Sequence, residues 1–167
     1  LSVEDGGDLV KIGQNTPDFY WGMSQNLSYK QFDASFQFQG SHGAEVYNID
    51  PLYYGSQWGG RLADVPADSP LIERNRNQTD AMIQDASYIA LRNLTLGYTV
   101  DASFVESLGL SSFRAYVAAS NLLYIMGDDY TSYNPEGVKG NDPTTYGAQV
   151  GASPVVRSFT VGLNINF

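Results

Sequence analysis

The chain contains one stretch, SFTVGLNINF at residues 158–167, in which apolar and polar side chains alternate without a break. The even-numbered positions of this stretch carry only Ser, Thr, Gly or Asn. Its odd-numbered positions are all apolar: Phe159, Val161, Leu163, Ile165 and Phe167. A period of two predicts a β-strand with one apolar and one polar face. The stretch is also as long as the about 9–11 residues that a tilted strand needs to cross a bilayer.

Working outward from this stretch, the same alternation recurs along the chain. Lys30 and Gln31 separate two such runs, and the parity of the apolar positions changes across them. A two-residue turn at this point keeps Tyr29 and Phe32 on one face of the sheet. Further along, Ile89 is out of phase with the residues that follow, which indicates a β-bulge. The predicted strands cover residues 18–29, 32–40, 87–100, 113–125 and 156–167.

Two long segments, 41–85 and 126–154, lose the alternation and contain scattered Gly, Pro, Asp and Asn. Loops this long are uncommon in compact domains but are typical of the outer side of outer-membrane barrels. If Phe167 lies on the periplasmic side, antiparallel pairing places both long segments outside and the short connections in the periplasm. The sequence therefore predicts an all-β fold: an antiparallel transmembrane β-barrel segment of roughly five strands with long extracellular loops.

Composition excludes several classes of function. The net charge of −9 argues against binding to a nucleic-acid backbone. The absence of cysteine excludes disulfides, thiolate metal sites and a cysteine nucleophile. The single histidine, His42, has no identifiable catalytic partner in the sequence. We expect no catalytic residue and no enzymatic activity.

Several motifs resemble those of one membrane-protein family, the SusC/RagA-type TonB-dependent outer-membrane transporters. The similar stretches follow one another in the family's order and together cover most of the chain. The most recognisable is DASYI followed by LRNLTLGYT at residues 85–89 and 91–99. The others are PDF at 17–19, QNLSYK at 25–30, FD at 32–33, QGS at 39–41, FR and YV within 113–117, NLL at 121–123, and RSFT onward from 157.

The resemblance implies that residues 1–167 are the C-terminal part of a barrel domain of about 22 strands, with the plug and earlier strands absent from this chain. It implies a bacterial outer membrane, in a Bacteroidetes-like organism, as the location. It also implies import of an oligosaccharide or peptide nutrient with a SusD-like surface lipoprotein, driven by the TonB complex through the absent N-terminal part. Further partners would be the rest of the barrel, its plug and the lipid bilayer; no cofactor is implied.

The candidate site residues follow from these expectations. The odd-numbered residues 159–167 are expected to form the signal for barrel assembly. Aromatic residues in the long segments could contact substrate or the lipoprotein, or else pack into small cores of the loops: Tyr53, Tyr54, Trp58, Tyr130 and Tyr133. Polar residues on the strands are expected to face the lumen, where they could touch substrate or plug or simply bond to one another: Asp33, Gln37, Gln39, Asn93, Thr95, Asn164 and Asn166.

Calcium is a weak further hypothesis. Asp128, Asp129 and Glu136, with Asn134 and Asp142, offer oxygen ligands of the kind that Ca²⁺ prefers. Their spacing does not match an EF-hand, and acidic loops are usually only solvated. We therefore expect no metal or cofactor as the main interpretation.

Two alternatives remain open at this point. A soluble carbohydrate-binding β-sandwich would bury the apolar faces of two sheets against each other. A porin that works without TonB would have an open lumen. The sequence does not identify the nutrient, because the long segments contain no readable motif.

Overall fold

The structure of the chain is a computed structural model with two compact units, which are described separately. We call residues 19–41, 88–126 and 154–167 the sheet unit. We call residues 1–18, 42–87 and 127–153 the loop unit. Within these units the structure describes residues 11, 13–50, 82–107, 109–137 and 147–167.

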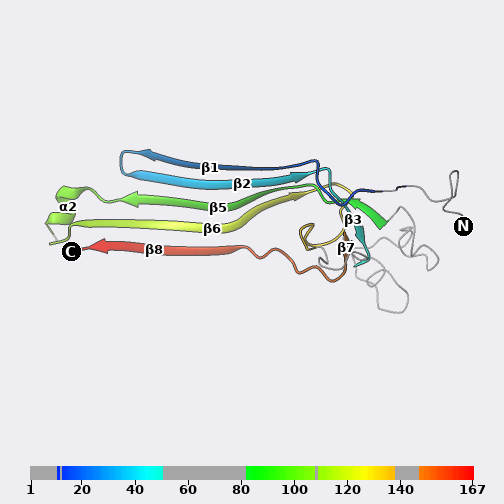
Figure 1. Cartoon of the computed structure of the whole chain (residues 1–167). Coiled ribbons are helices and arrows are strands. Elements are labelled where there is room, and N and C mark those ends of the chain that lie inside the picture. The colour runs from blue at the N-terminus through cyan, green and yellow to red at the C-terminus, as the bar shows by residue number, and fades with distance from the viewer. Residues whose placement is uncertain (1–10, 12, 51–81, 108, 138–146) are drawn as a thin grey trace, which may run out of the picture. The chain divides into compact units, whose positions relative to one another are not determined.

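The sheet unit is a five-stranded β-sheet with the strand order β1-β2-β5-β6-β8 (Figure 1). Antiparallel ladders join β2 to β5, β5 to β6 and β6 to β8. The strands are 9 to 15 residues long, enough to cross a bilayer at a tilt. Their bounds are Phe19–Tyr29 for β1, Phe32–His42 for β2, Tyr88–Thr99 for β5, Ser112–Met126 for β6 and Ser158–Asn166 for β8.

The register of the ladders separates apolar from polar residues, as the alternation predicts. Phe36 lies opposite Leu94, and Val117 lies opposite both Leu96 and Val161. Directly opposite residues share a face of the sheet. One face is therefore apolar across β2, β5, β6 and β8, and the other face is polar.

The edge strand β1 presents its apolar side to the same face. A Cβ atom placed on Gly40 of β2 would overlap the indole ring of Trp21, so the ring lies directly over the glycine. Gly40 belongs to the apolar face because it lies opposite Ile89. Trp21 and the residues in phase with it, such as Leu27, therefore extend the apolar face to the edge of the sheet.

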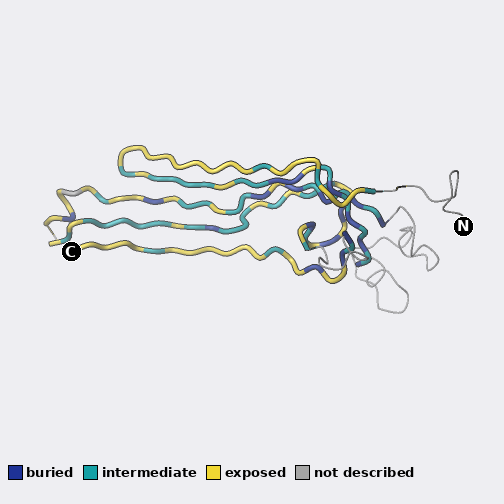
Figure 2. The backbone as a smooth tube through the Cα atoms, in the orientation of Figure 1, coloured by how far each residue is buried: buried dark blue, intermediate teal, exposed yellow. Residues whose placement is uncertain are grey.

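The apolar face is largely open. Exposed fractions reach 77% for Val161, 58% for Leu163 and 56% for Leu27. Exposed positions predominate along β1 and β8, the two edge strands (Figure 2). A sheet that folds in water buries such a face, because each large apolar side chain left exposed forgoes about 1.5–3 kcal/mol of burial free energy.

The β-bulge predicted in β5 is confirmed. The register shifts between Gln37, which lies opposite Asn93, and Phe38, which lies opposite Leu91. Arg92 therefore has no opposite residue on β2. The extra residue restores the phase of Ile89 and Leu91, which join the apolar face opposite Gly40 and Phe38. The two residues are therefore out of phase in sequence but not in space.

The connections at one end of the sheet are short, as expected. Lys30 and Gln31 form the two-residue turn between β1 and β2, and Lys30 has a positive φ of 54°. The connection between β5 and β6 contains one short helix, α2, at Ala102–Glu106. Among the described residues, no helix has the length and apolar character needed to span a membrane.

The loop unit corrects the prediction that both long segments lack regular structure. It contains a three-stranded sheet in the order β4-β3-β7, in which β3 pairs antiparallel with β4 and parallel with β7. The bounds are Glu45–Asn48 for β3, Ile83–Asp85 for β4 and Ala148–Gln149 for β7. Strands of two to four residues are too short to show a period in the sequence.

Candidate functional site

The polar face of the sheet unit carries the residues predicted to face a lumen. The ladders place Asp33 opposite Gly97 and Gln37 opposite Asn93. Thr95 lies opposite Ser35 on the same face. The remaining predicted residues join them through side-chain bonds or through the β6–β8 ladder: Gln39, Asn164 and Asn166. The register thus collects the predicted set on one face, while its contact with a lumen stays a prediction.

An ion pair with two hydrogen bonds joins β6 to β2 on this face. Arg114 of β6 donates from Nε to Asp33 Oδ1 over 2.8 Å and from Nη2 to Asp33 Oδ2 over 2.5 Å. The side chain reaches β2 across the intervening β5, where a Cβ on Gly97 would overlap both partners. The guanidinium also lies 5.1 Å from the ring centre of Tyr116. Asp33 and Arg114 neutralise each other, so the face gains a rigid polar feature without net charge.

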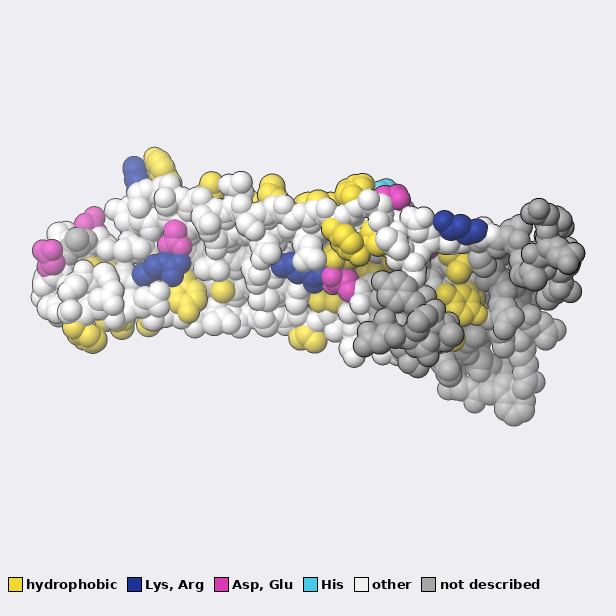
Figure 3. All heavy atoms as spheres, in the orientation of Figure 1, with side chains coloured by type: hydrophobic (Ala, Val, Ile, Leu, Met, Phe, Trp, Pro, Cys, Tyr) yellow, Lys and Arg dark blue, Asp and Glu magenta, His cyan; other side chains and the backbone are white. Residues whose placement is uncertain are grey.

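Amide and hydroxyl groups continue this face with uncharged hydrogen bonds. Asn93 Nδ2 donates to Gln37 Oε1 over 3.0 Å, and Ser120 Oγ donates to Asn93 Oδ1 over 3.3 Å. These bonds run across β2, β5 and β6 in one row. Figure 3 shows this face as mainly white, with basic beside acidic side chains and some hydrophobic side chains next to them, while other hydrophobic side chains lie along its long margins.

An arginine–tyrosine cluster lies at the bulge. The Tyr88 and Tyr124 rings stack at 5.2 Å, and the Arg92 guanidinium carbon lies 5.6 Å and 5.4 Å from their centres. Arg92 also donates to Gln39 Oε1 over 3.2 Å and to Asn121 Oδ1 over 3.3 Å. Sequence reasoning missed Arg92, Asn121 and Tyr124 as members of the polar face. The break in the apolar–polar alternation at Ile89 could have indicated this, because a bulge turns a neighbouring side chain to the other face of the sheet.

Among the described residues of the loop unit, buried polar side chains form a hydrogen-bonded network. Gln149 and Asn48 are fully buried, and Asp50 is 2% exposed. Gln149 Nε2 donates to the backbone oxygen of Asn134 over 2.9 Å, and Ser132 Oγ donates to Asp50 Oδ2 over 2.6 Å. Among the described residues, every buried side-chain polar atom has a hydrogen-bond partner. A network that is completed in this way fixes one arrangement of the chain.

Tyr130 belongs to this network. Its ring is buried, and its hydroxyl donates to Gln149 Oε1 over 2.7 Å. Burial raises the pKa of the Tyr130 hydroxyl from its ordinary value near 10.0 to about 12, against the opposing effect of the hydrogen bond to Gln149. Tyr130 thus packs inside the loop unit. This is the second of the two roles expected for aromatic residues in the long segments, namely packing into a small core of the loop.

Of the remaining aromatic candidates, the structure describes only Tyr133. Tyr133 is 51% exposed. Tyr53, Tyr54 and Trp58 lie outside the described residues. Contact of these residues with a substrate or a lipoprotein stays a prediction.

The acidic candidates gain no support as a calcium site. The Asp129 carboxylate accepts the backbone N–H of Asp85 over 3.2 Å, while Asp128 and Glu136 are exposed. Asp142 lies outside the described residues. Within the described ranges, no three or more His, Cys, Asp or Glu side chains gather closely enough to hold a metal ion.

Comparison with proteins of known sequence identifies relatives along the whole chain. The chain is 38% identical over 96% of its length to "TonB-dependent receptor P3" of Formosa agariphila, and 30% identical to "TonB-dependent receptor P26" of the same species. It is 24% identical over 98% of its length to "TonB-dependent receptor SusC" of Bacteroides thetaiotaomicron. The chain spans only 16–18% of the length of these relatives. No protein-family model matches the chain.

Solved structures share the fold. The chain superposes on the RagAB peptide importer in its "open-open" state with a TM-score of 0.66 and 22% identity. The match covers 91% of this chain and 17% of the RagAB chain. The described sheet thus has the fold of part of that transporter's barrel, as the sequence predicts, and it is not closed in this chain. The relatives found are receptors and transporters rather than enzymes.

Proposed function

This chain belongs by homology to the SusC/RagA-type TonB-dependent receptors, and from this premise we propose that it forms barrel wall in an outer-membrane nutrient importer. One observation carries the proposal: a sheet of membrane-spanning length has an open apolar face and a hydrogen-bonded polar face. In a closed barrel the apolar face meets lipid and every strand edge is paired.

The polar face then lines the lumen. Its ion pair and amide bonds satisfy one another, so the wall offers little uncompensated charge to a passing solute. The long segments connect strand ends on the outer side and contribute to the vestibule, where exposed aromatics such as Tyr133 meet substrate or a lipoprotein. In this account the chain contributes structure and surface rather than catalysis.

Location is tested by fractionating cells that express the natural full-length protein. We expect a polypeptide several times larger than 18.3 kDa in the detergent-extracted outer membrane. It should migrate faster before boiling than after, as closed barrels do. A free-standing species in the aqueous fraction would contradict the barrel and favour the β-sandwich alternative.

The transported nutrient is an oligosaccharide or a peptide. The RagAB neighbour is described as a peptide importer, and we place this chain in an importer that works with a SusD-like lipoprotein and the TonB complex. Uptake of fluorescent peptide and oligosaccharide mixtures should fall when the receptor gene or TonB is deleted. Uptake that persists without TonB would favour the porin alternative. Capture of the receptor without a lipoprotein from detergent extracts would contradict the partner assignment.

A further inference from the structure

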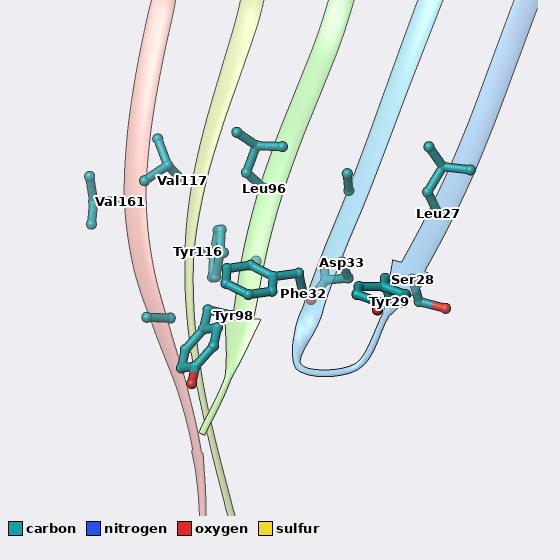
Figure 4. Close-up of a pocket in the computed structure, with 13 residues that line it drawn as sticks. Leu27, Ser28, Tyr29, Phe32, Asp33, Leu96, Tyr98, Tyr116, Val117 and Val161 are labelled. Atoms are coloured by element: carbon teal, nitrogen blue, oxygen red, sulfur yellow. The ribbon is translucent and has the colours of Figure 1, made fainter. Parts of the chain in front are cut away.

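A shallow hollow of about 540 Å³ lies on the apolar face, near the Lys30–Gln31 turn (Figure 4). It crosses all five strands from Leu27 on β1 to Val161 on β8. Small side chains, Ala34 and Ala115, line it between larger ones. The positions next to these alanines on the same face of β2 and β6 carry Phe or Val, so the face is recessed at the two methyl groups.

The rim of the hollow changes character along the strands. Figure 4 shows Leu27, Leu96, Val117 and Val161 on the side away from the turn, and Tyr29, Phe32 and Tyr98 on the side near it. Phe32 and Tyr98 contact each other with ring centres 4.9 Å apart. Aliphatic side chains suit the interior of a bilayer, and aromatic side chains suit its interface.

A cation stands at the aromatic end. The Lys30 Nζ lies 5.3 Å from the ring centre of Tyr29, and the turn exposes the lysine. The other described cations of the strands, Arg92 and Arg114, bond to side chains of the polar face instead. Lys30 does not itself line the hollow, but its charge lies over Tyr29, which lines the aromatic end.

We propose that this hollow binds an anionic phospholipid, with one acyl chain over Ala34 and Ala115 and the phosphate beside Lys30. The proposal rests on the proposed function, since it needs the apolar face to lie in a membrane. Further barrel strands would extend the sheet beyond β1 and β8 and would leave the hollow uncovered. A purely apolar partner would leave Lys30 unused, whereas one basic side chain near a bilayer surface favours anionic lipid by about fivefold.

The test uses the full-length receptor, purified in detergent and analysed by native mass spectrometry with added phosphatidylglycerol or phosphatidylcholine. Ala115→Phe fills the hollow, and Leu123→Phe adds bulk on the same face of the same strand outside it. Lys30→Gln removes the cation, and Arg157→Gln is its exposed control. Heat-dependent migration of each variant checks that the barrel has formed, which separates failure of the proposed function from failure of this proposal.

We expect retained phosphatidylglycerol in the parent and both controls. Ala115→Phe should lose it, and Lys30→Gln should lower the preference for phosphatidylglycerol over phosphatidylcholine about fivefold. Equal retention in all correctly assembled variants would overturn the proposal. A dimer of the receptor that Ala115→Phe dissociates, without loss of lipid, would overturn it in favour of a second copy as the occupant.

Discussion

The sheet unit and the loop unit differ in which side chains they expose and which they bury. The sheet unit leaves apolar side chains such as Val161 and Leu163 exposed, whereas the loop unit buries polar ones such as Gln149 and Asn48. A protein in water usually does the opposite: it buries apolar side chains and exposes polar ones. The exposed apolar side chains are stable if one face of the sheet meets lipid, and the buried polar side chains among the described residues are stable because their hydrogen bonds are completed.

The largest effect should come from a charge on the apolar face. Leu163→Arg is expected to cost about 2–4 kcal/mol of folding free energy if the residue lies near the bilayer midplane. Thr160→Arg, on the polar face of the same strand, should cost less because its charge meets water in the lumen. Reversible unfolding of the receptor in lipid vesicles measures both, and equal costs would contradict the assignment of the faces.

A smaller effect is expected from breaking the loop unit's network. Gln149→Leu leaves the partners of a buried side chain without bonds, which costs about 1–3 kcal/mol. Gln37→Leu, on the exposed polar face of the sheet, should stay within about 0.5 kcal/mol. Hydrogen exchange at the amides of β3 and β7 reports the local stability. Unchanged protection in Gln149→Leu would mean that the network does not hold this unit.

The loop unit should lose stability in alkali. Because burial raises the pKa of Tyr130 to about 12, the folded loop unit keeps this proton at a pH where the unfolded chain, with a value near 10.0, has lost it. Its stability is therefore complete below pH 10.0 and falls as pH rises toward about 12. Tyr130→Phe should remove this dependence, as measured by hydrogen exchange against pH. A parent protein with no loss above pH 10.0 would contradict the burial of the hydroxyl.

The smallest effect concerns the ion pair of the polar face. Asp33→Asn and Arg114→Gln should each weaken the cross-strand contact slightly, because both groups are partly exposed. In a double-mutant cycle the coupling should shrink as salt concentration rises. A coupling independent of salt would mean that shape and packing over Gly97, rather than charge, hold the two residues together.

The same contrast explains what could be predicted from the sequence. The sheet unit was predictable because period-two alternation survives over long strands, and even the bulge at Arg92 left a visible phase break. The ion pair between Asp33 and Arg114 was not, since its residues are far apart in sequence and meet only across β5. The loop unit was missed because its strands are short, and because nothing in the sequence around a polar residue such as Gln84 distinguishes burial from solvation.

The most direct test of this account measures which solvent each face of β8 meets. This chain has no cysteine, so single cysteines can be introduced from position 158 to 166 of an otherwise cysteine-free full-length receptor, then spin-labelled and reconstituted in bilayers. Accessibility to oxygen, which concentrates in lipid, should peak at Phe159, Val161, Leu163 and Ile165 and fall at the residues between them. A flat profile, or peaks at the even positions, would contradict the barrel wall.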